Sequence, residues 1–407
     1  MAIQSDPYAP NFTLNIQGVE PGERFLKAIT EAKFEDESDR ISSLRFTMNY
    51  RRLYEGGFNA DLISSKFFSP GNLVVLRGGY GNDIRDIGAG YITELDPNFP
   101  DQGEPNISVT CFDQLHKLSL NKTEKGETFK DLRDSQIAST IGERNGFKIS
   151  MNDPTSFAGI RRTLGGTKTR VQKRGQSDLD FLKELAKLNA YELFCKWDDK
   201  GKRFLLFFEP PKDRTKPVFT YMYDMNVPYN VSKHKNEFIA TLNSFKPKIS
   251  IAAQYTKYKV FSFDRKTGKK IAHTLTMDEF MQGQEDLKLG GLKSDELLKK
   301  NAATSGAGVR QKAFGDVTEI VGDKNFASEQ EAKEYLRNHM RKIARDFITG
   351  TGKIIGNQYM QSRQVNKFGN LGAFFDGNYF MKKVVHVFND AGYKGSLTVR
   401  KTIKEQV

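Results

Sequence analysis

The sequence is poor in the residues that most often carry covalent or metal chemistry. Its 407 residues include two cysteines, Cys111 and Cys195, five histidines and one tryptophan. Two cysteines without a Cys-x-x-Cys spacing exclude a disulfide framework, and each lies in a run that predicts a strand, where a buried thiol is expected. Because the histidines show no paired spacing, no metal site is assigned. They are His116, His234, His273, His339 and His386.

Long apolar runs are also missing. No stretch of about 18 apolar residues is present, so we expect no membrane span. The first residues do not combine a basic segment with an apolar run, so no signal peptide is expected. From these two absences we expect the protein to be made and to fold in a cytoplasm.

Two glycine-containing stretches fail as nucleotide-binding loops. In Gly350–Lys353, Ile354 stands where a P-loop needs Ser or Thr, and Phe347 replaces the first glycine. Gly88–Gly90 lacks the third glycine of the dinucleotide fingerprint and lies in a predicted strand. His386, between two valines of an alternating strand, is expected to be structural or solvent-facing. We therefore assign no catalytic, cofactor-binding or metal-binding residue and expect no enzyme.

The chain is basic, with 63 Lys and Arg against 50 Asp and Glu and a net charge of +13. Its densest basic run is Arg161–Arg174. One interpretation is contact with nucleic acid or an acidic partner; the other, which we favour, is a solvated loop before a helix. No aromatic residues interleave with the run, as a binder of single strands would require, so specific nucleic-acid binding is not expected.

One helix followed by a hairpin is predicted most clearly, within residues 171–208. Ser177 and Asp180 have the spacing of a helix cap, and an apolar face follows at steps of three and four residues. The pattern then changes to period two, which predicts strands over 191–197 and 203–209.

The rest of the chain is mainly β in pattern. Strands are predicted over 11–17, 41–49, 73–78, 87–95 and 107–112, whereas 23–29 is compatible with a strand or a short helix. Further helices are expected over 135–146 and after Ser328, whose capping box with Glu331 starts a helix that ends at Gly350. Residues 277–325 read as a long loop or arm.

We therefore predict an α+β, mainly β fold with two tube-like antiparallel β-barrels and inserted α/β parts. The expected divisions are a first barrel over 1–115, an inserted α/β domain over 116–232, a second barrel over 233–276 plus 350–407, and an inserted arm and helix over 277–349.

An internal echo suggests that the two barrels are copies. Tyr91 is followed 17 residues later by Ser108-Val109-Thr110, and Tyr379 is followed at the same interval by Ser396-Leu397-Thr398. An aromatic residue and a glycine lie between them in both cases, displaced by one position. A repeated unit, in which a strand is followed by a connection and a return strand, would give this pattern. The alternative is that two unrelated hairpins resemble each other by chance.

Several segments together resemble the baseplate-hub family of contractile phage tails, the late control D proteins, which is related to the hub part of type VI secretion spike proteins. The segments are Gln176–Leu182 with Tyr191–Phe194, Phe245–Gly268, Gly369–Tyr379, Val385–Val387, Gly392–Arg400, and in the first barrel Gly71, Gly88–Thr93, Cys111–Asp113 and His116.

The resemblance implies a structural role. Hub subunits of this type form a homotrimer, in which two barrels per chain make a pseudo-six-fold ring between the six-fold tail tube and the three-fold spike. The implied partners are the tube protein, a central spike protein, other baseplate (wedge) proteins and a tape measure protein. Since the chain stops after the second barrel, the spike is expected to be a separate polypeptide. The implied location is the tail baseplate of a virion, assembled in the host cytoplasm.

Two other functions stay open at the level of sequence. One is a nucleic-acid-binding protein that uses the basic surface, and the other is a peptidoglycan-hydrolysing tail tip. The second would need an additional helical domain with paired carboxylates, for which the divisions above leave no length.

Overall fold

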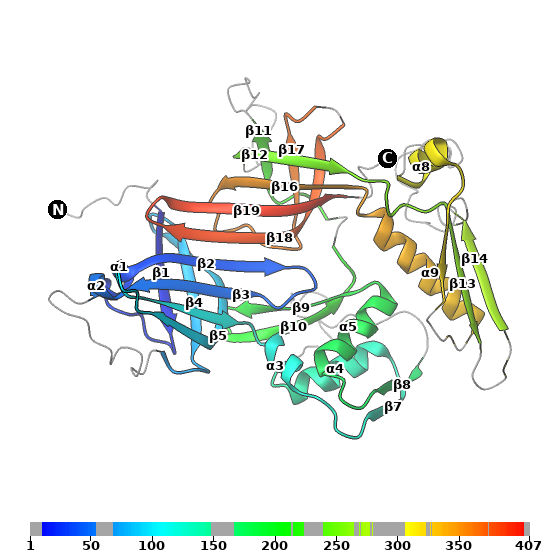
Figure 1. The fold of residues 1–407 in the computed structure, drawn as a ribbon, viewed down its shortest axis with the longest axis horizontal. Helices are drawn as coiled ribbons and strands as arrows, with labels where there is room; N and C mark the ends of the chain where they lie inside the picture. The colour runs from blue at the N-terminus through cyan, green and yellow to red at the C-terminus, as the bar shows by residue number, and fades with distance from the viewer. Residues whose placement is uncertain are drawn as a thin grey trace.

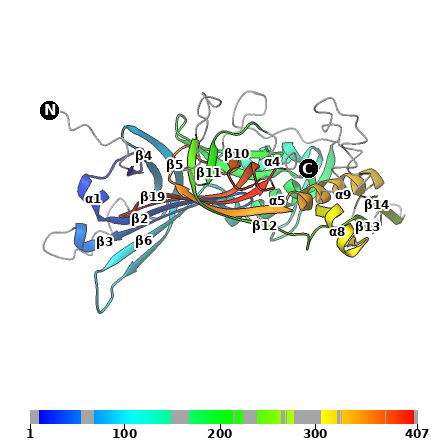
Figure 2. The same cartoon turned by 90° about the horizontal axis from the view of Figure 1, so that it is seen from above.

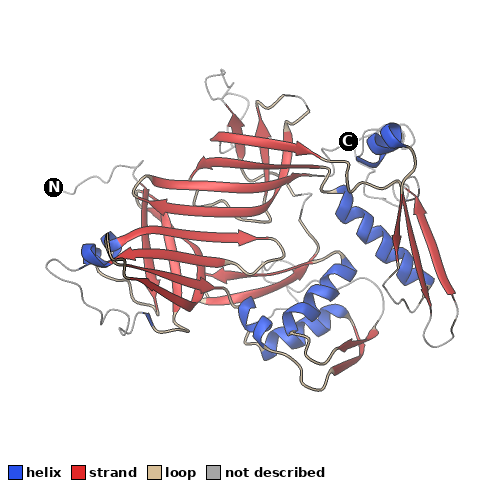
Figure 3. Ribbon diagram, in the orientation of Figure 1, coloured by secondary structure: helices blue, strands red, loops and turns tan. Residues whose placement is uncertain are grey.

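The computed structural model describes residues 10–53, 68–147, 167–212, 215–223, 239–263, 268, 270–276, 279, 306–322, 326, 328–372 and 374–402. Strands dominate the molecule, the longer helices lie at one end, and two short helices lie at the opposite end (Figure 3). The fold is the expected α+β, mainly β class, with a closed six-stranded barrel, a second curved sheet and two helix-containing insertions. Among the described residues, no helix combines the length and the apolar character needed to cross a membrane.

The first six strands form one curved antiparallel sheet. They are β1 (Pro10–Ile16), β2 (Ile29–Glu37), β3 (Ser43–Asn49), β4 (Leu73–Tyr80), β5 (Asp83–Asn98) and β6 (Asn106–Phe112). Their order is β1-β4-β5-β6-β3-β2, and this unit is the expected first barrel, although among the described residues its end strands β1 and β2 do not pair to close it. Alternate residues of each strand face one core, and the short helices α1 (Glu23–Ala28) and α2 (Tyr50–Leu53) lie beside one another at the end of this unit.

Most strands of this unit are those that the sequence predicts, with two differences. The ambiguous segment at 23–29 is helix α1, with Phe25 and Ala28 buried. The strand β2, which directly follows it, was not predicted. Its charged residues alternate with Ala32 and Phe34, so its pattern becomes visible only once one face is known to be buried.

The second barrel is built from late strands of the chain. They are β11 (Thr220–Tyr223), β12 (Ile239–Ile249), β16 (Ile348–Ile355), β17 (Val365–Gly369), β18 (Gly377–Asn389) and β19 (Gly392–Lys401). The order is β11-β17-β18-β19-β16-β12, and pairing of β11 with β12 closes the ring. β11 lies within 116–232, the range expected for the inserted domain, yet it completes this barrel.

The two units repeat one strand order. If strands are numbered one to six along each unit, both read one-four-five-six-three-two across the sheet. The echo noted in the sequence falls on corresponding hairpins, β5–β6 and β18–β19, so its origin in a strand and its return strand is confirmed. The first strand differs in direction: β1 is antiparallel to β4, whereas β11 is parallel to β17.

The units are joined side by side by one antiparallel contact between β2 and β18 (Figure 1). The first half of β18 pairs with β17 and the second half, Lys383–Asn389, pairs with β2. Beyond this contact, Phe388 and Tyr393 of the β18–β19 hairpin lie in the core of the first unit. The two barrels therefore share a hairpin and cannot pack independently.

An inserted α/β unit lies between the barrels in sequence. It contains α3 (Leu115–Leu120), β7 (Glu127–Leu132), α4 (Asp134–Arg144), β8 (Lys168–Gln172), α5 (Asp178–Asn189), β9 (Glu192–Asp198) and β10 (Arg203–Glu209). The predicted cap is confirmed, because Ser177 Oγ accepts a hydrogen bond from the Asp180 amide at 3.1 Å. Phe181, Leu182 and Leu185 of α5 are buried in a core shared with β9 and β10.

A second insertion projects from the end of the second barrel (Figure 1). It contains β13 (Lys257–Phe263), β14 (Lys270–Thr276), α8 (Gly306–Phe314), β15 (Thr318–Val321) and α9 (Glu329–Ala344). β13 and β14 lie in the range expected for the second barrel, but they form a separate sheet of order β14-β13-β15 that packs on α9. Most of the expected arm at 277–325 lies outside the described residues.

Helix α9 is shorter than the sequence predicts. Ser328 caps it, since the Glu331 amide donates to Ser328 Oγ at 3.2 Å, but the helix ends at Ala344 and not at Gly350. Ile348–Ile355 is the strand β16, and Phe347 lies in the core of the second barrel rather than on the helix. β-branched residues such as Ile348 and Thr349 favour a strand at this point.

Candidate functional site at the junction of the two barrels

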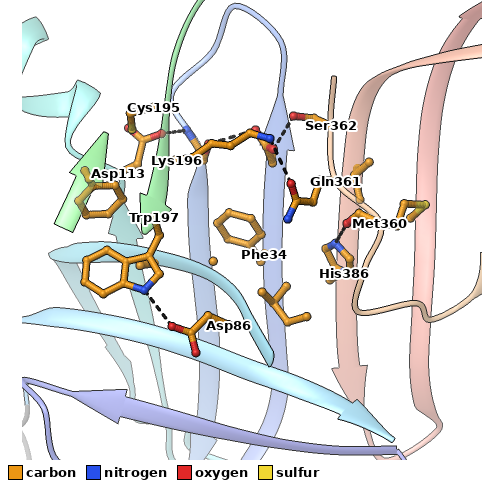
Figure 4. A pocket seen from close by; sticks show the side chains of 17 residues that line it. Phe34, Asp86, Asp113, Cys195, Lys196, Trp197, Met360, Gln361, Ser362 and His386 are labelled. Carbon is orange, nitrogen blue, oxygen red and sulfur yellow. Dashed lines mark hydrogen bonds between the residues drawn. The ribbon is translucent and has the colours of Figure 1, made fainter. Parts of the chain in front are cut away.

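A small polar cavity marks the place where both barrels and the inserted unit meet (Figure 4). Its volume is about 70 Å³. Asp36 enters from β2, Lys196 and Trp197 from β9, His386 from β18, and Met360–Ser362 from the segment between β16 and β17. Residues from four distant parts of the chain thus line one site.

The central contact is a buried ion pair between Asp36 and Arg363. Arg363 Nη1 lies 2.9 Å from Asp36 Oδ1, and the side chains of Arg363 and Asp36 are 5% and 14% exposed. Arg363 Nη2 also donates to the carbonyl oxygen of Glu37 at 3.0 Å. Although burial opposes ionisation, Arg363 and the hydroxyl of Ser362 hold the pKa of Asp36 below its usual value.

Arg363 also contacts the inserted unit. Its guanidinium carbon lies 4.1 Å from the ring centroid of Phe194 on β9, a cation–π arrangement. The backbone of Arg363 is left-handed, with φ of +65°, a conformation that costs about 1–2 kcal/mol in a residue with a side chain. One residue therefore ties together β2, β9 and the segment that precedes β17.

From the sequence, His386 is expected to be structural or solvent-facing, and the structure buries it. Its Nε2 lies 3.0 Å from the carbonyl oxygen of Met360 and its Nδ1 lies 2.6 Å from the hydroxyl of Tyr393. Because a carbonyl only accepts, Nε2 carries the proton and Nδ1 accepts from Tyr393. Burial lowers the pKa of His386 to about 4, so the ring is neutral at physiological pH.

Asp113, at the end of β6, closes the other side of the cavity. Its carboxylate accepts the amides of Ser42 at 2.7 Å and Leu115 at 2.9 Å. Burial nevertheless raises the pKa of Asp113 to about 6, and burial also raises that of the neighbouring Cys195 thiol. Trp197 Nε1 donates to Asp86 at 2.9 Å across the same cavity.

The chemistry of the cavity suits a lock between parts of the fold. A protonated thiol is a poor nucleophile, and both nitrogens of His386 already have partners. Each polar group described here spans two or more elements, so the cavity fixes the relative positions of the barrels and the inserted unit. Because the net contribution of a buried ion pair to the free energy of unfolding is small, the main effect of such a pair is to fix the positions of the elements that it joins.

The remaining histidines lie on separate elements. His116 is on α3, His273 on β14 near Glu329 at 3.7 Å, and His339 on α9 next to Glu319 at 3.1 Å. His234 lies outside the described residues. In the described part of the chain, no three His, Cys, Asp or Glu side chains gather as metal ligands would.

The glycine-containing motifs lie inside strands. Gly350–Lys353 belongs to β16 and is paired on both sides, so it forms no loop around a phosphate. Gly88 of β5 leaves room for the ring of Phe34, since a Cβ added there would lie 2.3 Å from that ring.

The basic run makes internal contacts where it is described. Arg170 Nε lies 2.8 Å from Asp134 Oδ1, and Lys168 Nζ lies 3.2 Å from Glu331 Oε1 on α9. The described part is the strand β8 and not a solvated loop, while Arg161 and Arg162 lie outside the described residues. These two charges therefore connect β8 to α4 within the inserted unit and to α9 of the second insertion.

Asp36, Arg363 and Lys196 were not singled out from the sequence. Asp36 lies in the unpredicted strand β2, and Arg363 lies in a turn whose partner is more than 300 residues away. In the sequence, Asp113 stands out only as part of the segment Cys111–Asp113, which resembles the baseplate-hub family. The sequence offers no local signal for a buried pair of this kind, because both side chains occur in surroundings typical of surface positions.

Solved structures with the same fold include proteins described as phage tail proteins. The chain shares its fold with the 43 kDa tail protein of prophage MuSo2 from Shewanella oneidensis, at 12% identity and a TM-score of 0.64, over 97% of this chain and 99% of that one. A tail protein from Neisseria meningitidis is similar at 8% identity and a TM-score of 0.63, over 98% and 99%. A type VI secretion component of E. coli matches at 10% identity and a TM-score of 0.52, over 95% and 76%.

Sequence comparison gives the family. The model of the Alg8 N-terminal domain family matches residues 11–390, and the chain belongs to this family. No curated protein sequence matches the chain.

Proposed function

We propose that the protein is a structural baseplate hub of a contractile phage tail or a related injection particle. In this proposal three chains form a ring with six similar barrels, which adapts a six-fold tail tube to a three-fold spike. The likeness to late control D proteins and the tail-protein fold support this function. The role is mechanical, and no catalytic step is assigned to it.

The observation that carries the proposal is a continuous array of eight strands. It runs β12-β16-β19-β18-β2-β3-β6-β5 through both barrels without a break. Its two halves repeat one topology, and β12 and β5 lie at opposite ends (Figure 1). A head-to-tail contact between these ends closes a ring if the rotation per chain divides the circle.

The outward face of this array is mainly polar. Residues that point away from the two cores include Arg45, Thr351, Lys353 and Thr398, although Val385 and Val387 of β18 lie on the same face. A sheet that lines a wide, water-filled passage needs such a face, whereas a sheet packed in a core needs an apolar one. In a ring of three chains, this face would line the central passage.

We also propose the domain division that the sequence suggested, a first barrel over 1–115, an inserted domain over 116–232, a second barrel over 233–276 and 350–407, and an arm over 277–349, with two changes. β11 joins the second barrel, and β13 and β14 join the arm together with α9. The proposed partners are the tail tube protein, a central spike protein, wedge proteins and the tape measure protein. The proposed location is the tail baseplate of the particle, with assembly in the host cytoplasm.

Mass and shape of the purified chain test the proposal. Light scattering should give three times the chain mass of 46.2 kDa, and electron-microscope class averages should show a ring with six density lobes around an opening. A particle that stays monomeric at all concentrations, or a ring with another number of chains, would contradict the hub function.

A further inference from the structure

The two barrels agree in the irregularities of their strand pairing as well as in strand order. The β5–β6 register slips between Ile92 and Glu94, and the β18–β19 register slips between Met381 and Lys383. A second pair of slips occurs in β2–β3, between Ile29 and Glu31, and in β12–β16, between Leu242 and Ser244. Since bulges fix the register of a sheet, corresponding residues of the two barrels can be read off.

This correspondence places charges of opposite sign at equivalent positions. Glu94 lies opposite Thr110, and Lys383 lies opposite Thr398, so Glu94 in the first barrel corresponds to Lys383 in the second. The same argument through Arg45 and Thr351 makes Lys33 equivalent to Lys246. Two residues further on, Glu35 corresponds to Lys248.

Within one chain, the equivalent positions already form the seam between barrels. In the antiparallel β2–β18 pairing, Lys383 lies opposite Glu37 and Val385 lies opposite Glu35. Lys383 Nζ forms an ion pair with Glu35 and lies 3.5 Å from Glu37 Oε2. The acidic residues are on the second strand of the first barrel, and the base is on the fifth strand of the second.

The corresponding strands at the two ends of the array have no such partner. In the described part of the chain, β5 beyond Ile92 pairs only with β6, and β12 beyond Leu242 pairs only with β16. The end of the β5–β6 hairpin projects from the body of the molecule (Figure 2). Glu94, Asp96, Lys246 and Lys248 are all exposed, and none makes an ion pair with another described residue.

We propose that neighbouring subunits join by antiparallel pairing of β5 residues 94–98 with β12 residues 246–250, in the register of β2–β18. In this register Asp96 lies opposite Lys248, Asn98 lies opposite Lys246, and Glu94 reaches Lys248 as Lys383 reaches Glu35. The partner is a second copy of this chain, and the inference rests on the proposed ring. Leu95 and Ile249 supply backbone N–H and C=O groups for such a contact at the exposed edges, whereas Pro97 and Pro247, which lie opposite each other in this register, have no N–H to donate.

The reversed charges specify which barrels meet. At the internal seam the second strand is acidic and the fifth is basic, and at the seam between subunits the second strand is basic and the fifth acidic. Docking β2 on β5 would bring Glu35 to Glu94, and docking β12 on β18 would bring Lys248 to Lys383. Like charges at cross-strand positions are unfavourable, so the barrels must alternate around the ring.

Charge reversal and compensation test the seam. Glu94→Lys with Asp96→Lys should raise the concentration at which half of the trimers dissociate by about tenfold or more, because like charges then face each other. Adding Lys246→Glu and Lys248→Glu to that variant should restore assembly. Lys394→Glu, an equal charge change at an exposed position within the array, serves as the control and should leave the midpoint unchanged.

Cross-linking tests the register itself. When chains carrying only Asp96→Cys are mixed with chains carrying only Lys248→Cys and oxidised, a covalent dimer should form, since directly opposed residues place their Cβ atoms about 4.5–5.5 Å apart. Asp96→Cys mixed with Glu35→Cys should give none. A wild-type trimer that resists charge reversal and forms no Asp96–Lys248 cross-link would overturn the seam but leave the hub function standing. A wild-type monomer would overturn the hub function first.

Discussion

Arg363 reaches Asp36 across 327 positions of sequence and forms with it a buried ion pair at the junction of the two barrels. The pair draws the segment before β17 onto β2, while the stacking of Arg363 on Phe194 adds the inserted unit. A single side chain thus fixes three parts of the fold, and the proposed ring would depend on this fixed arrangement of the two barrels.

Breaking this ion pair should strongly destabilise the protein. Either Arg363→Met or Asp36→Asn leaves one polar partner buried alone, which costs about 3–5 kcal/mol in the free energy of unfolding. The double variant should cost less than the sum of the two, because neither partner is then left uncompensated. Urea unfolding of the four proteins measures this coupling. Glu23→Gln, which removes a surface pair with Lys27, is the control and should change stability by less than about 1 kcal/mol; additive effects at Asp36 and Arg363 would refute the coupling.

His386 should make the protein less stable in acid. Its folded pKa of about 4 lies below the ordinary value of 6.5, so the unfolded state binds more protons between these values and stability falls as pH drops from 6.5 towards 4. Between pH 6.5 and pH 5 this group should account for about 1.5 kcal/mol. His386→Gln should remove that part of the slope in urea unfolding measured at both pH values.

Asp113 changes the stability of the protein in the opposite direction over the same pH range. Its folded pKa of about 6 lies above the ordinary value of 3.8, so the stability that it contributes below pH 3.8 is lost as pH rises through 6. Because this effect is common to wild type and His386→Gln, the difference between the two proteins isolates the histidine. Equal pH slopes for the two proteins would show that His386 is not held neutral.

Gly88 should tolerate no side chain. A Cβ at this position would lie 2.3 Å from the Phe34 ring, so Gly88→Ala should destabilise the protein by about 1–3 kcal/mol through overpacking. Gly322→Ala, where a Cβ meets nothing within 4 Å, should be close to neutral. Thermal or urea unfolding measures both, and combining Gly88→Ala with Phe34→Leu should recover part of the loss. A neutral Gly88→Ala would mean that the two sheet faces are not in contact here.

The N-terminal cap of α5 should contribute about 1 kcal/mol to the free energy of unfolding. Ser177→Ala removes the hydrogen bond to the Asp180 amide, and losses of this kind are about 0.5–2 kcal/mol. Ser177→Thr keeps a hydroxyl in reach and should retain most of the stability. The comparison is made by urea unfolding, and equal loss in both variants would point to packing around this buried residue instead of the cap.

Local signals in the sequence determined a large part of the fold. Alternation in segments such as Asn11–Gln17 and Ile41–Asn49 gives strands because one face must be buried, and Ser177 and Ser328 begin helices because their hydroxyls satisfy free amides. The echo around Tyr91 and Tyr379 even located corresponding hairpins of the two barrels. Each of these signals lies within a short stretch of chain.

Only the tertiary structure decided which strands join a barrel and which join an insertion. β13 and β14 carry the same alternation as barrel strands, but the helix α9 offers them a separate apolar face. β2 has too many charges to stand out, and its burial depends on β18, which lies more than 300 residues away. The same holds for the roles of charged residues. Burial and pairing are properties of the packed chain and not of the local sequence, so the roles given to Asp36 and Arg363, and to Glu94 and Lys248, depend on neighbours that folding brings to them.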